Sequence, residues 1–304
     1  MKRFLVLWGE RYLYHPSLIQ RILSLFLLPL SWIYCIGAYL RYRRSVPKSL
    51  GIPIVSIGNL TVGGSGKTPV VIELARHFDK PAIVLRGYGR QSSGMVVVKD
   101  KSTILCDVIR SGDEAMLYAE TLPSATVIVS EIRERGIAEA KAMGCEVVLL
   151  DDGYGKHSIK KLDLVIAVPT PNPFCLPSGA YRERLWKGKD AIILMERVAF
   201  QRSVSIKKPT EKMVLVTAIA RPERLDPYLP EVAEKIYFED HHFFTQGELE
   251  MIFERTGATS LLVTSKDLVK MSSFKLPLSV LELSITLDET LITTVKDYVN
   301  AAKN

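Results

Sequence analysis

Cysteine is scarce in this chain, and its few copies are far apart. Cys35, Cys106, Cys145 and Cys175 form no CxxC pair among 304 residues. Neither a zinc site nor a disulfide framework is therefore indicated, and we expect reduced thiols in a cytosolic chain. Internal repeats and low-complexity segments are also absent, which excludes a repeat architecture and a largely disordered chain.

One long stretch lacks charge altogether. Residues 22–40 contain no Asp, Glu, Lys, Arg or His and are bracketed by Arg21 and by three arginines at 41, 43 and 44. As a helix this N-terminal segment is just long enough to cross a membrane, although Pro29 should kink it. A helix lying in one leaflet fits equally well, and a buried core helix is the alternative. No small-residue cleavage site follows, so the segment is not a secretory signal.

Acidic residues are outnumbered by basic ones. There are 40 Lys and Arg against 33 Asp and Glu, giving a net charge of +7. This balance suits an anionic partner such as nucleic acid, an acidic membrane or a phosphorylated substrate, although a solvated basic surface explains it equally simply. The length allows two modest domains or one large one.

Strand and helix patterns alternate after Pro53. Runs rich in Val and Ile predict buried strands at 54–57, 82–85, 126–129, 147–150, 164–168 and 191–194, with helices at 68–78, 113–121 and 133–143. Residues 95–98 suggest a hairpin or edge strand. The alternation predicts an α/β fold with a doubly wound, mainly parallel sheet, whose ligands lie beyond the carboxyl ends of the strands.

A polar stretch at 197–209 is interpreted as a linker to a second, smaller α/β lobe. Strands are expected at 213–217, 236–238, 261–264 and 280–283, with one helix starting at a Thr245–Glu248 capping box and a terminal helix at 288–302. The predicted units are an N-terminal membrane-associating segment (1–50), a nucleotide-binding lobe (51–200) and a C-terminal lobe (210–304), with a cleft between the lobes.

The most informative motif is a glycine-rich turn between the first strand and the first helix of that pattern. Glycines let backbone N–H groups approach phosphate oxygens, a lysine reaches the β/γ-phosphates and a threonine ligates Mg²⁺. The usual pattern has glycine where this chain has Thr61. We expect the nucleotide site to comprise Thr61, Val62, Gly63, Gly64, Ser65, Gly66, Lys67 and Thr68.

Acidic residues follow other strands. Asp151 and Asp152 follow an apolar run. In a P-loop enzyme the carboxylate that binds Mg²⁺ is placed in the same way, at the end of a strand. We therefore predict that Thr68, Asp151 and Asp152 are the metal ligands. Asp113 opens a helix, where it is either an N-cap or a general base for a hydroxyl. In Asp240-His241-His242, a histidine–carboxylate pair acting on a proton is preferred to metal ligation.

Basic and aromatic residues after several strands are candidates for holding a substrate phosphate, although tight turns and surface ion pairs are the simpler interpretation. These candidates are Arg86, Tyr88, Arg90, Arg133, Arg135 and Arg182.

Taken together and in order, the motifs resemble the tetraacyldisaccharide 4′-kinases of lipid A synthesis over nearly the whole chain. They are Gly58-Asn59 through Lys67-Thr68-Pro69, Arg86-Gly-Tyr-Gly-Arg90, Gly112-Asp113-Glu114, Asp151-Asp-Gly153, Leu176-Pro-Ser-Gly179 with Arg182-Glu183, Asp240-His-His242 and Thr264-Ser-Lys-Asp267. The resemblance implies ATP- and Mg²⁺-dependent phosphorylation of the 4′-hydroxyl of a tetraacylated glucosamine disaccharide 1-phosphate, giving lipid IVA.

The same resemblance implies residue roles and a location. Asp113 is the base paired with His241, Lys67 and Thr68 act on phosphates and metal, and the N-terminal helix seats the enzyme on the cytoplasmic face of the inner membrane. It implies no nucleic acid and no obligate protein partner.

The chain departs from the family after Asp-Asp-Gly, where Tyr154-Gly155-Lys156-His157 stands in place of an aromatic residue followed by Gln-His. His157 either replaces the family histidine with a one-residue slip or the role is lost. The competing hypothesis is a non-kinase P-loop NTPase that switches a protein partner at the membrane.

Overall fold

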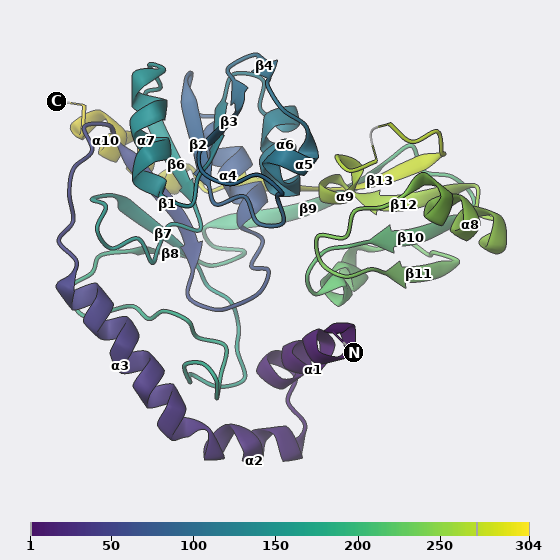
Figure 1. The fold of residues 1–304 in the computed structure, drawn as a ribbon, viewed down its shortest axis with the longest axis horizontal. Helices are drawn as coiled ribbons and strands as arrows, with labels where there is room; N and C mark the ends of the chain where they lie inside the picture. Colours follow the sequence, from purple (N-terminus) through teal and green to yellow (C-terminus); the bar gives the residue numbers. More distant parts are fainter. Residues whose placement is uncertain (1, 272, 304) are drawn as a thin grey trace.

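The computed structural model describes residues 2–271 and 273–303, and it has two sheet-containing lobes with three helices at the N-terminus (Figure 1). The predicted α/β class is confirmed. The larger sheet has the strand order β4-β3-β5-β2-β6-β1-β7-β8. Its strands are β1 (Ile54–Asn59), β2 (Pro81–Leu85), β3 (Val96–Asp100), β4 (Thr103–Ile104), β5 (Thr126–Val129), β6 (Val147–Asp151), β7 (Leu162–Ile166) and β8 (Ile192–Leu194).

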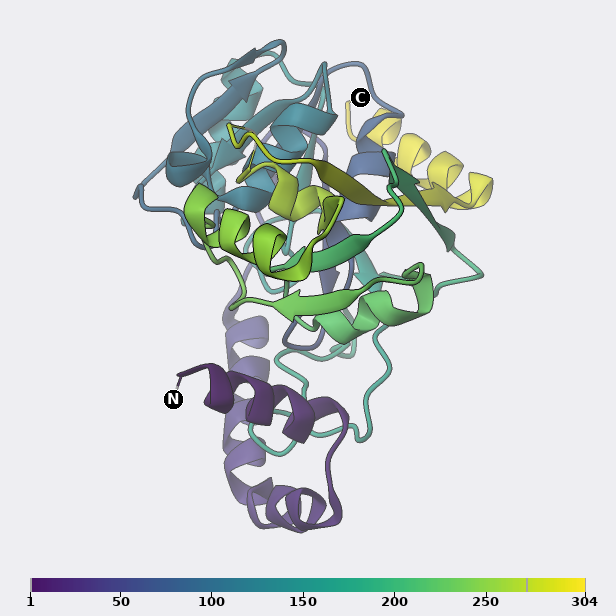
Figure 2. The ribbon, with the colours of Figure 1, turned by 90° about the vertical axis from the view of Figure 1, so that its right-hand side faces the viewer.

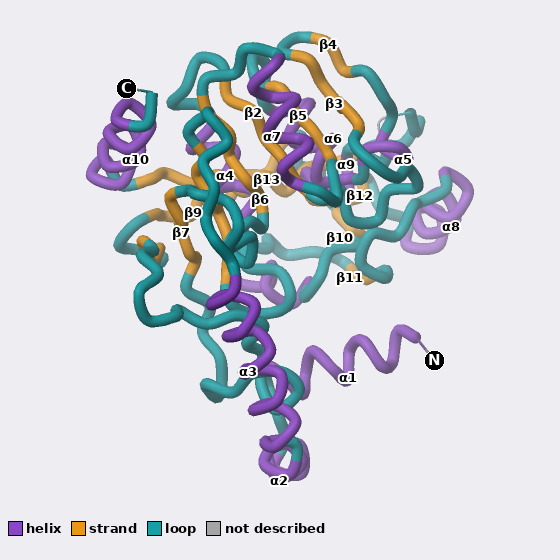
Figure 3. Tube along the Cα trace, turned by 60° about the vertical axis from the view of Figure 1, so that its left-hand side comes forward, coloured by secondary structure: helices purple, strands orange, loops and turns teal. Residues whose placement is uncertain are grey.

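The sheet is parallel except at one edge, where β3 and β4 form the expected hairpin. Every residue of β1, β2, β5 and β6 is buried, because helices cover both faces. On one face α4 (Lys67–Ala75) and α6 (Asp113–Thr121) share a core with Val55 and Val127. On the other, α7 (Arg133–Ala142) packs against Val84 and Ile128 (Figure 3). A short helix, α5 (Val108–Ser111), precedes α6.

The second lobe contains a five-stranded sheet in the order β11-β10-β12-β13-β9. Its strands are β9 (Phe200–Lys207), β10 (Met213–Thr217), β11 (Glu234–Tyr237), β12 (Ser260–Thr264) and β13 (Leu278–Leu287), and its helices are η1 (Pro222–Tyr228), α8 (Gln246–Thr256) and α9 (Ser265–Leu268). The Thr245–Glu248 capping box is present, and α8 ends at Gly257, which has a positive φ. Both features satisfy backbone groups at the helix ends.

The polar stretch at 197–209, interpreted above as a linker, is not irregular, because most of it is strand β9. Along β9 the less exposed residues, such as Phe200 and Val204, alternate with exposed ones, as in an edge strand with one face in water. β9 pairs antiparallel with β13 over residues 200–207. The chain therefore enters the second lobe along one strand of a ribbon and leaves along the other (Figure 1).

The C-terminal helix α10 (Glu289–Ala301) packs on the larger sheet. Leu291, Val295 and Val299 belong to the same hydrophobic cluster as Val55 and Val71. The sequence interpretation had placed this helix in the second lobe. We propose instead that the second lobe ends where β13 ends and that α10 belongs to the larger lobe.

Three helices precede the first lobe and extend away from it (Figure 2). They are α1 (Lys2–Tyr14), α2 (Leu18–Phe26) and α3 (Leu28–Arg44). The uncharged run is therefore broken at Leu27, with Pro29 in the first turn of α3. Among the described residues no single helix is long and apolar enough to cross a membrane, whereas α2 and α3 meet that criterion together, at an angle of 59°.

Candidate active site

The glycine-rich turn leaves the start of α4 open to an anion. Its last glycine, Gly66, has a φ of +77° and is the N-cap of α4, with no side-chain hydrogen bond to the first helical N–H groups. A Cβ on Gly66 would lie 2.7 Å from a guanidinium nitrogen of Arg202 in β9, but the end of that flexible side chain can shift, so it is the positive φ that favours glycine here. Unpaired N–H groups at a helix start bind phosphate readily.

Lys67 lies within a polar cluster at the carboxyl end of the large sheet. Its Nζ is 3.1 Å from Oδ1 of Asn59 and 3.4 Å from Oδ1 of Asp152. Arg182 donates to the same Asp152 carboxylate and, at 3.1 Å, to Asn59. Burial raises the pKa of Asp152, but Lys67 and Arg182 outweigh it and hold that pKa below its ordinary value. Three predicted site residues thus meet here, the acid Asp152 and the bases Lys67 and Arg182.

Asp151 differs from its neighbour because it is buried with little compensation. Tyr118 donates to its Oδ2 at 3.0 Å, and Oδ1 has no hydrogen-bond partner. Burial, followed by the nearby negative charge of Glu114, raises the pKa of Asp151 to about 7. Within residues 2–271 and 273–303 no group of three or more His, Cys, Asp or Glu side chains is arranged to hold a metal. Mg²⁺ commonly takes only one or two protein carboxylates plus phosphates and water, so Asp151 and Thr68 fit it.

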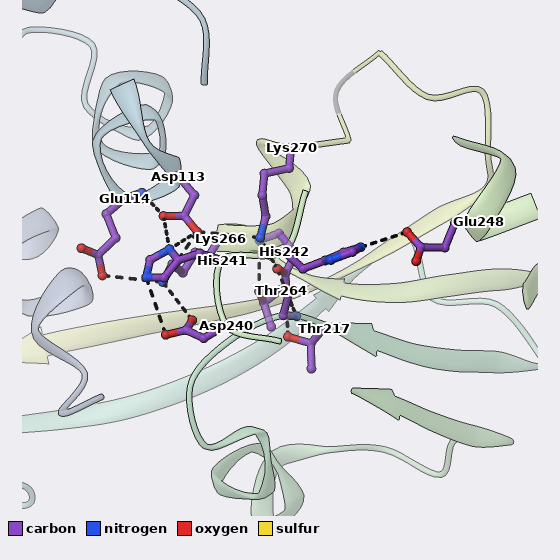
Figure 4. Close-up of polar contacts among 12 residues, drawn as sticks. Asp113, Glu114, Thr217, Asp240, His241, His242, Glu248, Thr264, Lys266 and Lys270 are labelled. Atoms are coloured by element: carbon purple, nitrogen blue, oxygen red, sulfur yellow. Dashed lines mark hydrogen bonds and ion pairs between the residues drawn. The ribbon is translucent and has the colours of Figure 1, made fainter. Parts of the chain in front are cut away.

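Asp113 and His241 come from different lobes and meet directly (Figure 4). Nδ1 of His241 lies 2.9 Å from Oδ2 and 3.0 Å from Oδ1 of Asp113. Asp113 is not the N-cap, since Gly112 occupies that position, and its Oδ1 accepts from the Glu114 N–H at 2.8 Å. His241 has a φ of +63°, an uncommon conformation for a non-glycine residue.

The charges of this dyad reinforce each other. Burial raises the pKa of Asp113, but the His241 hydrogen bond and Lys266 pull it below its ordinary value. For His241, burial lowers the pKa, yet the hydrogen bond to Asp113 outweighs it and the net direction is upward. Both directions favour a carboxylate paired with an imidazolium.

Two lysines from the second lobe approach the same carboxylate. Nζ of Lys266 is 3.7 Å from Asp113, 3.7 Å from Glu114 and 3.8 Å from Asp240. Nζ of Lys270 is 3.7 Å from Asp113. Lys266 belongs to the Thr264-Ser-Lys-Asp267 motif, whereas nothing in the sequence pattern points to Lys270.

The loop Arg86-Gly-Tyr-Gly-Arg90 borders the dyad. A Cβ on Gly112 would lie 2.8 Å from the carbonyl oxygen of Tyr88, and one on Gly89 would lie 3.3 Å from Cβ of His241. The glycines therefore allow this loop to approach both partners. Arg86 stacks on the Tyr88 ring at 5.2 Å, and both side chains are exposed.

Other candidate arginines are held by structural contacts. Arg90 pairs with Glu131 and donates to the Gly94 carbonyl at 2.6 Å. Arg133 is buried and donates to Ser130 O at 2.5 Å, and burial lowers its pKa. Arg135 is exposed on α7.

Two other histidines make contacts away from the dyad. His157 is buried 3.4 Å from Glu183, and Lys189 Nζ lies 3.0 Å from its Nδ1. His242 binds Glu248 at 3.0 Å and stacks on Phe238, so only one histidine of the adjacent pair reaches Asp113.

A cavity of about 560 Å³ lies between the lobes, lined by the glycine-rich turn, Lys67, Glu114 and Lys266. The second lobe and β9 contribute arginines that the sequence did not single out. Arg224 donates to Gly64 O, and Arg202 donates to Ser65 O at 3.4 Å. Arg221 lies 3.7 Å from the ring centroid of Tyr14 at the end of α1. No local motif could have identified these contacts, because they join distant segments.

Known proteins resemble this chain over nearly its whole length. Residues 23–300 match the family model of tetraacyldisaccharide-1-P 4′-kinase. Tetraacyldisaccharide 4′-kinase of Helicobacter acinonychis is 46% identical over 295 residues, covering 95% of this chain and 94% of the relative. The Aliarcobacter butzleri enzyme of that name is 42% identical, with 100% of both chains covered. A crystal structure of LpxK from Aquifex aeolicus in complex with ATP superimposes with a TM-score of 0.69 at 24% identity, covering 93% of this chain and 100% of that one, and supports the same fold.

Proposed function

The chain belongs to the tetraacyldisaccharide-1-P 4′-kinase family, and from that premise we propose how its residues carry out the reaction. It is an ATP-dependent kinase of lipid A biosynthesis, which transfers the γ-phosphoryl group of ATP to the 4′-hydroxyl of tetraacyldisaccharide 1-phosphate. The alternative of a non-kinase NTPase switch is not favoured, because the relatives reported above carry the kinase name over nearly their whole length.

The observation that carries the mechanism is the contact between Asp113 and His241 across the lobes, 2.9 Å long. As the 4′-oxygen forms its bond to the γ-phosphorus, the bond from that phosphorus to the ADP oxygen breaks, and the hydroxyl proton passes to Asp113. The His241 N–H orients the carboxylate and keeps it ionised until then. A base positioned in this way contributes about 10²–10⁴-fold to the rate.

The glycine-rich turn is proposed to bind the ATP phosphates. Residues 61–68 present backbone N–H groups and the start of α4, and Lys67 supplies positive charge where the phosphoryl group transfers. Thr68, Asp151 and Asp152 would hold Mg²⁺, which when bound neutralises phosphate charge. Of the arginines predicted from the sequence, Arg182 contacts Asp152 and Asn59 beside Lys67, and it is proposed to contact a phosphate there.

The N-terminal helices are proposed to seat the enzyme on the membrane that holds its lipid substrate. Phe26, Trp32 and Ile33 are at least 65% exposed, whereas α2 and α3 contact the protein through polar groups and through Tyr39 and Tyr42, which pack against Trp186. Ser24 donates to Ser178 O at 2.9 Å, and Arg41 lies 2.6 Å from Glu183. An outer apolar face with arginines at its end suits the interface of an anionic leaflet, which we propose is the cytoplasmic face of the inner membrane.

The test is an assay of ATP turnover with and without tetraacyldisaccharide 1-phosphate in mixed micelles, with the lipid product resolved. We expect turnover to depend on the lipid and to yield one phosphorylated product per ADP formed. ATP hydrolysis at the same rate without the lipid, and no phosphorylated lipid, would refute the assignment. The same disaccharide carrying a blocked 4′-position is the matched control and should not be phosphorylated.

A further inference from the structure

A short segment of the second lobe ends in a lysine that the mechanism above does not use. Strand β12 runs into the one-turn helix α9, and Lys270 follows two residues after that helix. Its side chain is 1% exposed, so the charge is almost completely withdrawn from water. Burying an unpaired ammonium group is very unfavourable, so its partners indicate why it is there.

The first partner of Lys270 is Asp267, at 3.0 Å, and this carboxylate is firmly held. Asp267 is fully buried and accepts hydrogen bonds from Thr217 at 2.6 Å and from Thr264 at 2.8 Å. The Ala218 N–H also donates to it, at 3.3 Å. Asp267 is therefore a fixed support, joined by these hydrogen bonds to the ends of both β10 and β12.

The second partner is in the other lobe. Nζ of Lys270 lies 3.7 Å from Oδ2 of Asp113, the oxygen that is 2.9 Å from His241. One ammonium group thus lies between a carboxylate that is fixed within its own lobe and the carboxylate proposed as the base. With His241 charged, these four groups carry two negative and two positive charges, an arrangement that a buried site tolerates.

Lys266 differs from Lys270 in what it can reach. It is 19% exposed, lines the interlobe cavity and is shared among Asp113, Glu114 and Asp240. Lys266 can therefore turn toward a bound phosphate. Lys270 is not among the residues that line that cavity, so its charge remains directed at Asp113.

We propose that Lys270 is a positioning residue for the kinase reaction: supported by Asp267, it holds the Asp113 carboxylate ionised and in line with His241 when the lobes meet. This inference rests on the proposed function, in which Asp113 is the base. The groups that face Asp113 are His241, Lys266 and Lys270, with Glu114 and Asp240 bound to Lys266. Removing the buried cation should make Asp113 easier to protonate.

The pH dependence of kcat/KM for the lipid tests the inference in the full-length enzyme. An opposite charge within ~4–6 Å lowers a carboxyl pKa by about 1–3 units, so Lys270→Met should move the acidic limb of the profile up by about one pH unit or more. Activity should fall much more at acidic than at alkaline pH, with KM for ATP unchanged. Lys270→Arg, which keeps the charge, should restore the limb toward its original position.

Lys99→Met is the matched control. Lys99 is also buried, at 4% exposed, but it donates to the Ala119 and Leu122 carbonyls and faces no carboxylate at the dyad. We expect this variant to lower the melting temperature without moving the acidic limb. A Lys270→Met enzyme that behaves like Lys99→Met, less stable but with an unmoved limb, would overturn the positioning role.

A second variant distinguishes loss of the positioning role from a folding defect. Lys270→Met alone leaves Asp267 without its cation, whereas Asp267→Asn/Lys270→Met removes both charges together. The double variant should shift the acidic limb in the same direction but by less, because the negative charge of Asp267 is lost as well, and an unmoved limb in a folded double variant counts against the proposal. Failure of the base assignment is recognised separately, because Asp113→Asn would then keep most of its kcat whatever Lys270 does.

Discussion

Replacing Asp113 and His241 singly and together tests whether the two residues act as a unit. Asp113 is only 3% exposed and binds His241 through both carboxylate oxygens, at 2.9 and 3.0 Å. Each alanine variant removes one partner of this contact. If Asp113 accepts the hydroxyl proton only when His241 orients it, either loss removes most of the assistance that the pair gives.

The expected magnitudes separate the two hypotheses clearly. General-base assistance is worth about 10²–10⁴-fold, or about 2.7–5.4 kcal/mol of transition-state free energy at 1.36 kcal/mol per tenfold. Residues acting as a unit should give about 10²–10⁴-fold in each single variant and little more in the double variant. Independent contributions would multiply to about 10⁴–10⁸-fold. The coupling free energy should therefore be about 2.7 kcal/mol or more.

Single-turnover transfer from ATP to the glycolipid, with enzyme in excess, measures this coupling without interference from product release. His242→Ala is the matched control, because this adjacent histidine binds Glu248 and stacks on Phe238 instead of reaching Asp113. It should keep nearly full transfer. Multiplicative losses, or an Asp113→Ala enzyme that retains kcat and only melts earlier, would refute the reasoning and leave the base unassigned.

Three further outcomes are expected. Lys67→Ala should lower transfer by about 10²–10³-fold while the melting temperature barely changes, since the Lys67 amine contacts only polar groups; near-normal turnover would exclude the phosphate role. Phe26→Asp and Ile33→Asp should each weaken binding to anionic vesicles about tenfold or more, with ATP affinity retained. Met251→Asp, at an exposed residue on α8, is the control and should leave vesicle binding unchanged; equal effects of all three variants in flotation assays would contradict membrane binding through α2 and α3. The contact between Asp113 and His241 should stabilise the fold fully above about pH 4, and this part should be lost as pH falls through the lowered pKa of Asp113. On the alkaline side the stabilisation should be full below about pH 6.5 and be lost as pH rises through the raised pKa of His241. The melting-temperature difference between the wild type and His241→Ala should therefore be largest between these two pH values, and a difference that is constant with pH would contradict this.

The sequence predicted those elements whose patterns are local. The strands at 126–129 and 213–217 and the helix at 113–121 have the predicted bounds, because buried parallel strands are continuous apolar runs and glycine marks the start of that helix. β9 was missed because its outer residues are polar and resemble a linker. Periodicity predicted helix α10 but carries no information about which sheet the helix covers.

The candidate site was predictable where it lies on strand ends. Lys67 and Asp152 each follow a strand of the parallel sheet, and the topology brings them to within 3.4 Å. Arg90 also follows a strand, yet its side chain pairs with Glu131 instead of facing the cleft. Sequence spacing alone does not show in which direction such a side chain points. Lys270 could not be identified from the sequence, because its proposed role depends on a contact with Asp113 in the other lobe.

The contacts between the lobes explain why the site draws its residues from both. Asp113 starts a helix of the larger lobe, while His241, Lys266 and Lys270 belong to the smaller one. The two lobes are joined by the β9–β13 ribbon, and Arg202 on β9 contacts the glycine-rich turn through Ser65 O. A ligand bound between the phosphate turn and the second lobe would therefore contact both of the elements that keep His241, Lys266 and Lys270 against Asp113. Nucleotide binding should accordingly stabilise the contacts that hold the base ionised and oriented.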